Sequence, residues 1–319
     1  MNATDIAVTV STSRRDFIGG SDIPAIIGVS PWADEYACYL GKIGELPPPE
    51  GETKVQRRGK VLEHAIGVLY IDDAPHHPTL LPGITLAHPD VPHFRAQIDA
   101  LEETDDGHIP IEIKSASEFT RGQWGRSGTD DAPTYYCAQL HWQLMATGAP
   151  YGRIVALLGA DDLRVYTIER DEAVADFLGR RAAEFWERVQ TRNAPPINFD
   201  HRSTGETLAR LFRNFNATEI VQADDALRAW RDVMVQSGER IKEYEGVREG
   251  AKAHLLATMR TAAVIDFGDG TQYERKEVKR SGYTVESMTY VDARMKKTPK
   301  SKPGESPALL EGQSWATNN

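Results

Sequence analysis

The alternation of apolar and polar residues is most regular between residues 94 and 117, where it predicts two strands joined by a tight turn. Residues 94–101 place every second side chain on an apolar face, as a half-buried β-strand does. Residues 109–114 repeat the pattern, with three isoleucines on one face. The dipeptide Asp106-Gly107 lies between the two runs and is a common turn signal. We therefore expect a β-hairpin with one face against a core.

Other segments repeat apolar residues every three or four positions, as amphipathic helices do. The expected helices cover residues 21–28, 34–43, 55–71, 133–148, 171–192 and 205–214. Two further strands are expected over 153–158 and 163–169, a second hairpin over 263–279, and loops rich in proline and histidine over 72–93. A stripe over residues 224–261 predicts a helix about 55 Å long, which must project from the core or pack as a hairpin.

The composition is that of a globular protein with a large domain and an extension, or with two domains. No run of about 18 apolar residues is present, so we expect no membrane span, and the N-terminal residues lack the pattern of a secretory signal. Cys38 and Cys137 are the two cysteines, which fits a reducing cytoplasm and excludes a four-cysteine zinc or iron–sulfur site. We expect a cytoplasmic protein.

The formal net charge of −10 argues weakly against a nucleic-acid partner. Salt screens charges beyond roughly 10 Å at 0.1 M, so a local basic surface can outweigh a distant acidic one. Basic residues do cluster locally, for example at Arg14-Arg15 and at Arg121 with Arg126. Each cluster alone is more typical of a solvated face than of a DNA-binding site.

The hairpin pattern also brings three chemically useful side chains together. Asp99, Glu112 and Lys114 fall on the polar face, so they would converge opposite the apolar core. Two carboxylates suit Mg²⁺ or Mn²⁺, and an ammonium can hold a phosphate or orient a water. The spacing is therefore compatible with metal-assisted phosphodiester hydrolysis. Taken alone, the spacing is more typical of a solvated hairpin face.

Four motifs in order give the chain a resemblance to a known family. They are IGGSDIPAIIGVSPW at 18–32, RRGKVLEHAIGVLY at 57–70, the hairpin with Asp99 and IEIKSAS at 111–117, and YYCAQLHWQLMATG at 135–148. In this order they resemble the YqaJ-type viral recombinases, relatives of the lambda-type exonucleases in the PD-(D/E)XK nuclease superfamily. The resemblance covers residues 14–190 and extends weakly to VKRSGYTVESMTYVDARMKK at 278–297.

The resemblance implies an α/β fold with a restriction-endonuclease-like core, in which helices flank a mixed central sheet. A C-terminal helical and β-hairpin extension would follow. The implied domains are a nuclease core over 14–200 and an extension over 201–300, with disordered termini over 1–13 and 301–319. The extension could serve as an oligomerisation element, a clamp on DNA or a docking site, and the pattern does not choose between a ring and a monomer.

The resemblance also assigns catalytic roles. Asp99 and Glu112 would bind the metal, with the carbonyl of Ile113 as a backbone ligand, and Lys114 would orient the water. Family members carry an acidic residue where this chain has Glu63 and a glutamine where it has Gln139. Gln143, one helical turn later, is an alternative carrier of that second role. We interpret His141 and Trp142 as packing residues.

Two further regions are implied to bind DNA. Ser21 begins a predicted helix, and in lambda-type exonucleases this region and an upstream arginine grip the terminal 5′-phosphate. Either Arg14 or Arg15 would be that arginine. The loop RGQWGRSG contains Arg121, Trp124 and Arg126, of which the tryptophan could stack on a base.

The function implied is a metal-dependent exonuclease of phage-type recombination. It would digest one strand of double-stranded DNA from its ends in the 5′→3′ direction and work with a single-strand annealing protein. Two alternatives stay open, a structure-specific endonuclease or end-processing nuclease on the same fold and a non-catalytic DNA-binding recombination module. No G-x-x-x-x-G-K-[ST] motif supports an ATP-driven recombinase.

Overall fold

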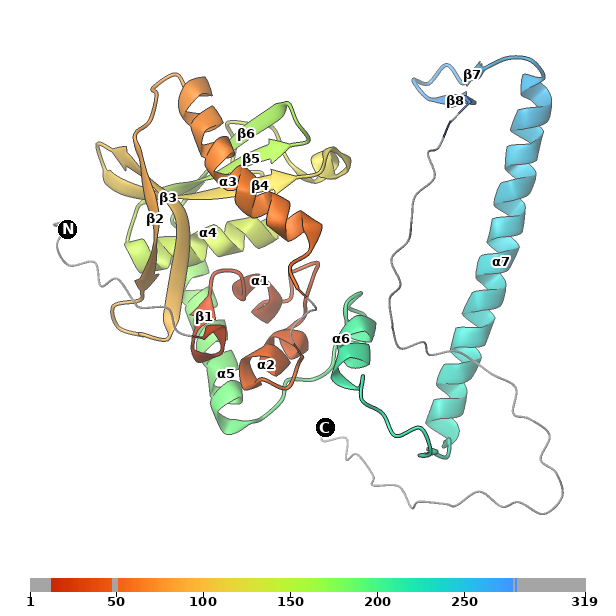
Figure 1. Ribbon diagram of the computed structural model, residues 1–319, viewed down its shortest axis with the longest axis horizontal. Helices are drawn as coiled ribbons and strands as arrows, with labels where there is room; N and C mark the ends of the chain where they lie inside the picture. The colour runs from red at the N-terminus through yellow and green to blue at the C-terminus, as the bar shows by residue number, and fades with distance from the viewer. Residues whose placement is uncertain (1–12, 48–50, 278, 280–319) are drawn as a thin grey trace. The chain divides into compact units, whose positions relative to one another are not determined.

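The computed structural model describes residues 13–47, 51–277 and 279, and its contacts divide the chain between Asn214 and Phe215 (Figure 1). The first unit holds a six-stranded mixed sheet in the order β1-β3-β4-β5-β6, with β2 also paired to β3. The strands are β1 (Ile18–Gly19), β2 (Leu80–Ala87), β3 (Phe94–Thr104), β4 (Gly107–Ala116), β5 (Tyr151–Leu158) and β6 (Asp162–Glu169).

Helices and two short 3-10 turns complete this unit. They are η1 (Arg14–Asp16), α1 (Ile23–Ile26), α2 (Glu35–Ile43), α3 (Lys54–Asp73), η2 (Glu118–Gln123), α4 (Thr134–Thr147), α5 (Glu172–Thr191) and α6 (Thr204–Leu211). The second unit contains α7 (Asp225–Met259) and a small hairpin of β7 (Val264–Asp266) and β8 (Gln272–Glu274). Among the described helices, none is both long enough and apolar enough to cross a membrane.

The central part of the first unit runs α3–β2–β3–β4–α4–β5. Strands β2, β3 and β4 pair antiparallel, and α4 then crosses over to place β5 parallel to β4. A crossover of this kind needs a helix, because parallel neighbours cannot be joined by a tight turn. The expected fold class, a mixed sheet flanked by helices with a helical and hairpin extension, is confirmed.

Both faces of β4 are covered by helices. The Ile113 side chain contacts Gly67 of α3, whereas the neighbouring Glu112 is hydrogen-bonded to α4. Because successive strand residues point to opposite faces, α3 and α4 lie on opposite sides of the sheet. The middle of β4, from Ile109 to Ile113, is therefore buried.

The predicted helix ends follow from capping residues. Helix α4 starts after Pro133 and stops at Gly148, which adopts the left-handed conformation with φ of 70°. Helix α2 begins at Asp34, whose carboxylate accepts from the Ala37 N–H at 2.8 Å. The long stripe and the second hairpin also form, as α7 and β7–β8.

Three local expectations were wrong. Strand β2 lies where loops were expected, because Pro82-Gly83 conceals its pattern. A side chain at Gly83 would clash with β3, since a Cβ there would lie 2.2 Å from the Ile98 carbonyl. The turn between β3 and β4 is shifted by one residue, with Thr104 paired to Gly107. Asp22, not Ser21, precedes the first helical residue of α1.

The first unit also extends beyond the boundary expected at residue 200. The Thr204 hydroxyl of α6 donates to Asp34 at 3.2 Å, so α6 packs on this unit and the division falls after Asn214. The expectations of disorder over 301–319 and over all of 1–13 except Ser13 lie outside the described residues. So does nearly all of the weakly resembling segment 278–297.

Candidate active site

The candidate site lies where β3 and β4 separate. Their pairing ends at Ala100 and Ile111, after which β3 continues beside β2 and β1 while β4 continues beside β5. The Ile113 N–H donates to Asp99 Oδ2 at 2.9 Å, which ties the two strands together across the opening. Asp99 therefore faces the β4 residues from the opposite strand.

Glu112 is completely buried, with 0% of its surface exposed. The Gln139 amide donates to Glu112 Oε1 at 2.6 Å, and the Gln143 amide donates to Oε2. Lys114 forms an ion pair with Oε1. Gln139 and Gln143, the two alternatives in the sequence analysis, thus both donate to the Glu112 carboxylate. The expectation that Glu112 lies on a face opposite the core was wrong, because α4 covers that face.

Burial raises the pKa of both carboxyl groups. For Glu112 desolvation dominates, and the nearby Asp99 adds to it against the opposing charge of Lys114, so its pKa rises to about 7. Desolvation also raises the pKa of Asp99, while Lys114 and the Ile113 N–H lower it. These carboxylates are held close together at an electrostatic cost that a cation would relieve.

Lys114 responds in the opposite sense. Burial alone would lower its pKa, but Glu112 and Asp99 raise it to about 12. Its ammonium also lies 5.1 Å from the centre of the Tyr136 ring, where cation–π attraction favours the charged form. Lys114 is therefore a fixed positive charge at neutral pH and not a proton acceptor.

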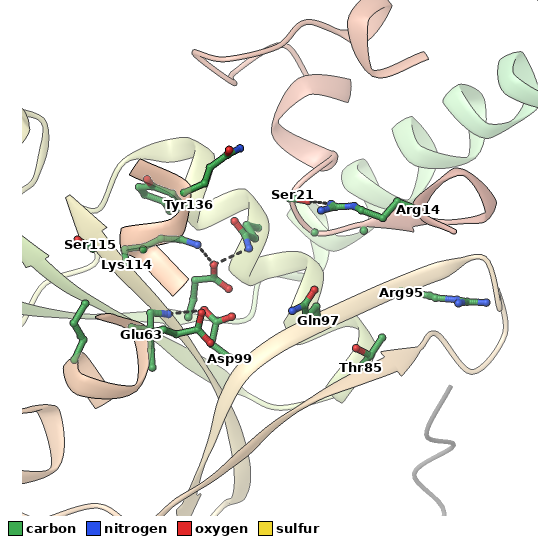
Figure 2. Close-up of a pocket in the computed structure, with 18 of the residues that line it drawn as sticks. Arg14, Ser21, Glu63, Thr85, Arg95, Gln97, Asp99, Lys114, Ser115 and Tyr136 are labelled. Atoms are coloured by element: carbon green, nitrogen blue, oxygen red, sulfur yellow. Dashed lines mark hydrogen bonds and ion pairs between the residues drawn. The ribbon is translucent and has the colours of Figure 1, made fainter. Parts of the chain in front are cut away.

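One cavity of about 710 Å³ joins these residues with others from distant parts of the chain. Glu63 of α3 lines it, and its pKa is raised by burial and by the charge of Asp99. Figure 2 shows Glu63 beside Asp99, with Lys114 and Tyr136 on the same side of the cavity and Arg14 and Ser21 on another.

The donor set fits an open Mg²⁺ or Mn²⁺ site. Within the described residues, no group of three or more His, Cys, Asp or Glu side chains is placed to hold a metal ion, so the candidate ligands are the two carboxylates alone. Mg²⁺ commonly binds one or two carboxylates and retains several waters, so Asp99 and Glu112 are sufficient. The Lys114 ammonium beside Glu112 demonstrates that this position favours a cation. The Ile113 carbonyl as a further ligand stays a prediction.

The N-terminal segment reaches the cavity through Arg14 and Ser21. The Arg14 guanidinium donates to the Ser21 hydroxyl, and both residues line the cavity. Arg15 lies elsewhere, with its guanidinium packed over Gly44, where a Cβ would lie 2.6 Å from it. The structure therefore places one of the two candidate arginines in the cavity and the other outside it.

A buried lysine holds this segment in place. Lys42 of α2 donates to the carbonyls of Arg14 and Phe17 at 2.8 and 2.6 Å, and forms a 2.6 Å ion pair with Asp22. The Asp22 carboxylate also accepts from the Gly19 N–H at 2.8 Å. The Lys42 ammonium thus has three partners, the carbonyls of Arg14 and Phe17 and the carboxylate of Asp22. These contacts hold the backbone of the segment that carries Arg14 and Ser21.

A family model matches part of the chain that contains this site. Residues 11–150 match the model described as the YqaJ-like viral recombinase domain. The protein YqaJ of Bacillus subtilis strain 168 is 26% identical over 239 residues, which cover 74% of this chain and 70% of that protein.

Solved structures also resemble the chain. An alkaline exonuclease, LHK-Exo from Laribacter hongkongensis, has a TM-score of 0.42 and 18% identity, and covers 56% of this chain and 90% of its own. Its complex with dAMP gives a TM-score of 0.43 with the same identity and coverage. The structure of SSO0001 has a TM-score of 0.38 and 15% identity, and covers 67% of this chain and 91% of its own.

The loop after β4 differs from expectation. Trp124 is only 5% exposed and stacks on Tyr136, with ring centres 5.4 Å apart, so it is a core residue and the expectation of base stacking was wrong. Arg121 forms ion pairs with Asp161 and Asp162 at 3.4 and 3.1 Å. Arg126 is exposed, and its contact with DNA stays a prediction.

Sequence reasoning missed several residues that line the cavity or support the segment beside it. Tyr136 could have been found, because it precedes Gln139 by three positions and so shares its helix face. Lys42 gave no signal, since a lysine in the last turn of a helix is ordinarily an exposed residue that favours the helix dipole. The other missed residues are Gln56, Thr85, Arg95 and Gln97.

Proposed function

We propose that this chain is a Mg²⁺- or Mn²⁺-dependent DNA exonuclease. It hydrolyses one strand of linear double-stranded DNA in the 5′→3′ direction and leaves a 3′ single strand. The observation that carries this proposal is that Asp99, Glu112 and Lys114 line the same cavity as Arg14 and Ser21. Hydrolytic groups and a phosphate-binding pair in one cavity support cleavage close to a strand end. The YqaJ-like domain over residues 11–150 adds support.

The hydrolytic roles follow from charge and burial. When bound, the metal ion would supply a Lewis acid and a water of lowered pKa. Asp99 and Glu112 would hold it, and the Gln139 and Gln143 amides keep the Glu112 carboxylate oriented. Lys114 stays protonated, so its ammonium stabilises the negative charge that develops on the scissile phosphate.

Arg14 and Ser21, on the other side of the cavity, would bind the 5′ end of a DNA strand. A terminal 5′-phosphate carries more charge than an internal phosphodiester and has no preceding nucleotide. The Arg14 guanidinium and the Ser21 hydroxyl offer it charge-assisted hydrogen bonds. Selection of 5′-phosphorylated ends, and hence the 5′→3′ direction, follows from this pair.

The test uses three DNA substrates. A linear duplex with a 5′-phosphate, the same duplex with a 5′-hydroxyl, and a closed circle are each incubated with the protein in Mg²⁺, Mn²⁺ or EDTA. We expect mononucleotides from the 5′-phosphorylated strand, slower digestion of the 5′-hydroxyl duplex, an intact circle, and no product in EDTA.

Other outcomes identify the alternatives. Nicks in the closed circle would contradict the proposal and favour an endonuclease. DNA binding without hydrolysis in either metal would favour a non-catalytic recombination module.

We also propose a single-strand annealing protein as the functional partner, because the 3′ single strand is the substrate of such proteins. Its capture on digested but not on intact duplex would support the pairing.

A further inference from the structure

Helix α7 carries an apolar stripe with the seven-residue spacing of a coiled coil. Leu227, Met234, Ile241 and Leu255 occupy one position of the heptad, with Arg248 between the last two. The second core position is occupied by Trp230, Ser237, Tyr244, Ala251 and Thr258. A repeat of 3.5 residues per turn is the pattern that packs one helix against another along its length.

This stripe is exposed along almost the whole helix. Met259 is the one residue of α7 that is buried, whereas Trp230 and Tyr244 are 69% and 72% exposed. Three glycines at 238, 246 and 250 weaken the helix, since glycine is disfavoured in helix interiors. A long helix with this composition depends on packing of its apolar face.

The charges of α7 favour a protein helix over DNA as the occupant. The helix has six acidic and six basic residues, and so no net charge. DNA binding relies on an excess of positive charge, which this helix lacks. Polar residues cover the outer face, including Arg228, Asp232, Glu239, Lys242 and Glu249.

We propose that a second copy of this chain covers the stripe, and that the two α7 helices form an antiparallel coiled coil centred near Glu239. In this register Arg248 of each helix faces Trp230 of the other, an arrangement that gives cation–π attraction. Met234 faces Tyr244, and Ile241 faces the small Ser237. A parallel pair would instead bring the two Arg248 side chains together in the core.

The rim of the same register is also complementary. Arg231 of each helix lies beside Glu245 of the other, so the dimer contains two Arg231–Glu245 ion pairs. Val233 lies beside Val247, so the apolar surface widens on the other rim. The one like-charge contact is Arg240 with its counterpart, which is a single contact against two ion pairs on the other rim.

The register leaves the C-terminal turn of α7 outside the overlap. That turn already has a partner, because the buried Met259 lies next to the β7–β8 hairpin of the same chain. The antiparallel pair therefore uses the stripe from Leu227 to Ala251 and leaves the end of α7 that contacts β7 outside the interface.

Sedimentation of the full chain tests the interface. We expect a dimer for the wild type, a monomer for Met234→Asp, and a dimer for Val235→Asp, a matched change on the adjacent outer position. A wild-type monomer, or a trimer, would overturn the proposal. So would an equal loss in both variants, since the effect would then not depend on the stripe.

Charge exchange tests the register without disturbing the core. Arg231→Glu and Glu245→Arg should each weaken the dimer about tenfold. Mixing the two variants should restore wild-type affinity, because each unlike pair is re-formed between the copies. Arg228→Glu on the outer face is the control. If the mixture does not recover wild-type affinity, the antiparallel register is wrong.

Lys114→Ala should remain dimeric, which separates this inference from the proposed nuclease activity.

Discussion

At the residue scale, Lys114 is held as a permanent cation by two buried carboxylates. Glu112 and Asp99 raise its pKa to about 12, which favours the charged form, so we expect its contribution to hydrolysis to be electrostatic. We expect Lys114→Ala to lower the rate of DNA cleavage by about 10²–10³-fold, the usual effect of losing one charge-stabilising donor. Single-turnover digestion of a 5′-phosphorylated duplex measures this.

The control for Lys114 is Lys60→Ala, which removes an exposed lysine of α3 that pairs with Glu52. It should leave the rate unchanged. If Lys114→Ala retains near-wild-type turnover while Lys60→Ala does too, the electrostatic role of Lys114 is wrong.

Arg14 and Arg15 form a natural matched pair. Arg14 lines the cavity beside Ser21, whereas Arg15 packs over Gly44. Arg14→Ala should remove the preference for 5′-phosphorylated over 5′-hydroxyl duplex, and Arg15→Ala should keep it. The ratio of the two digestion rates is the readout. If Arg14→Ala and Arg15→Ala give the same ratio of digestion rates, Arg14 does not contact the 5′-phosphate.

Much of the site could be predicted from single residues. Strand alternation alone placed Glu112 and Lys114 on one face, and the family resemblance added Glu63 and Gln139, all of which line the cavity. Trp124 was misplaced, because a tryptophan in a glycine-rich, arginine-flanked loop gives no sign of the neighbouring rings that bury it.

At the element scale, α2 supports the N-terminal segment through the buried Lys42–Asp22 pair. Lys42→Met leaves Asp22 and two carbonyls without their donor. We expect a loss of about 3–5 kcal/mol in unfolding free energy, typical of breaking a buried pair. Urea denaturation measures it, with Lys60→Met as the exposed counterpart expected to lose less than about 1 kcal/mol. Similar losses in both would show that the Lys42 pair is not structurally important.

The packing of α5 on the β2–β3 loop should depend on pH. His93 stacks on Trp186 of α5, with ring centres 5.0 Å apart, and burial lowers the pKa of His93. The unfolded chain then binds a proton more readily, so this contribution is intact above about pH 6.5 and is lost as the pH falls. His93→Asn should flatten the decline of Tm between pH 7 and 5.5. An unchanged decline would contradict this.

Elements with strong periodicity were predictable and those set by tertiary pairing were not. Helices α3, α4, α5 and α7 follow from their apolar spacing and caps. Strand β2 was not predicted, because Pro82-Gly83 breaks its alternation of apolar and polar residues. Glycine is required at position 83 by the close approach of β3, which the sequence of β2 does not show. The separation of β3 from β4, which opens the site, depends on β2 and β5 and cannot be derived from either strand alone.

At the scale of the whole molecule, the chain divides into a unit with the candidate site and a unit dominated by α7. The net charge of −10 did not predict the local chemistry, because the residues that face the cavity include Arg14, Arg95 and Lys114. The first unit contains the proposed cation site, and α7 of the second unit carries the exposed heptad stripe.

The central claim is that Asp99 and Glu112 bind one divalent cation beside Lys114. Anomalous diffraction from crystals grown with Mn²⁺ tests it most directly. We expect a single strong peak within about 2.0–2.3 Å of a carboxylate oxygen from both Asp99 and Glu112, and its loss in Asp99→Ala. A peak elsewhere, or none at saturating Mn²⁺, would contradict the account.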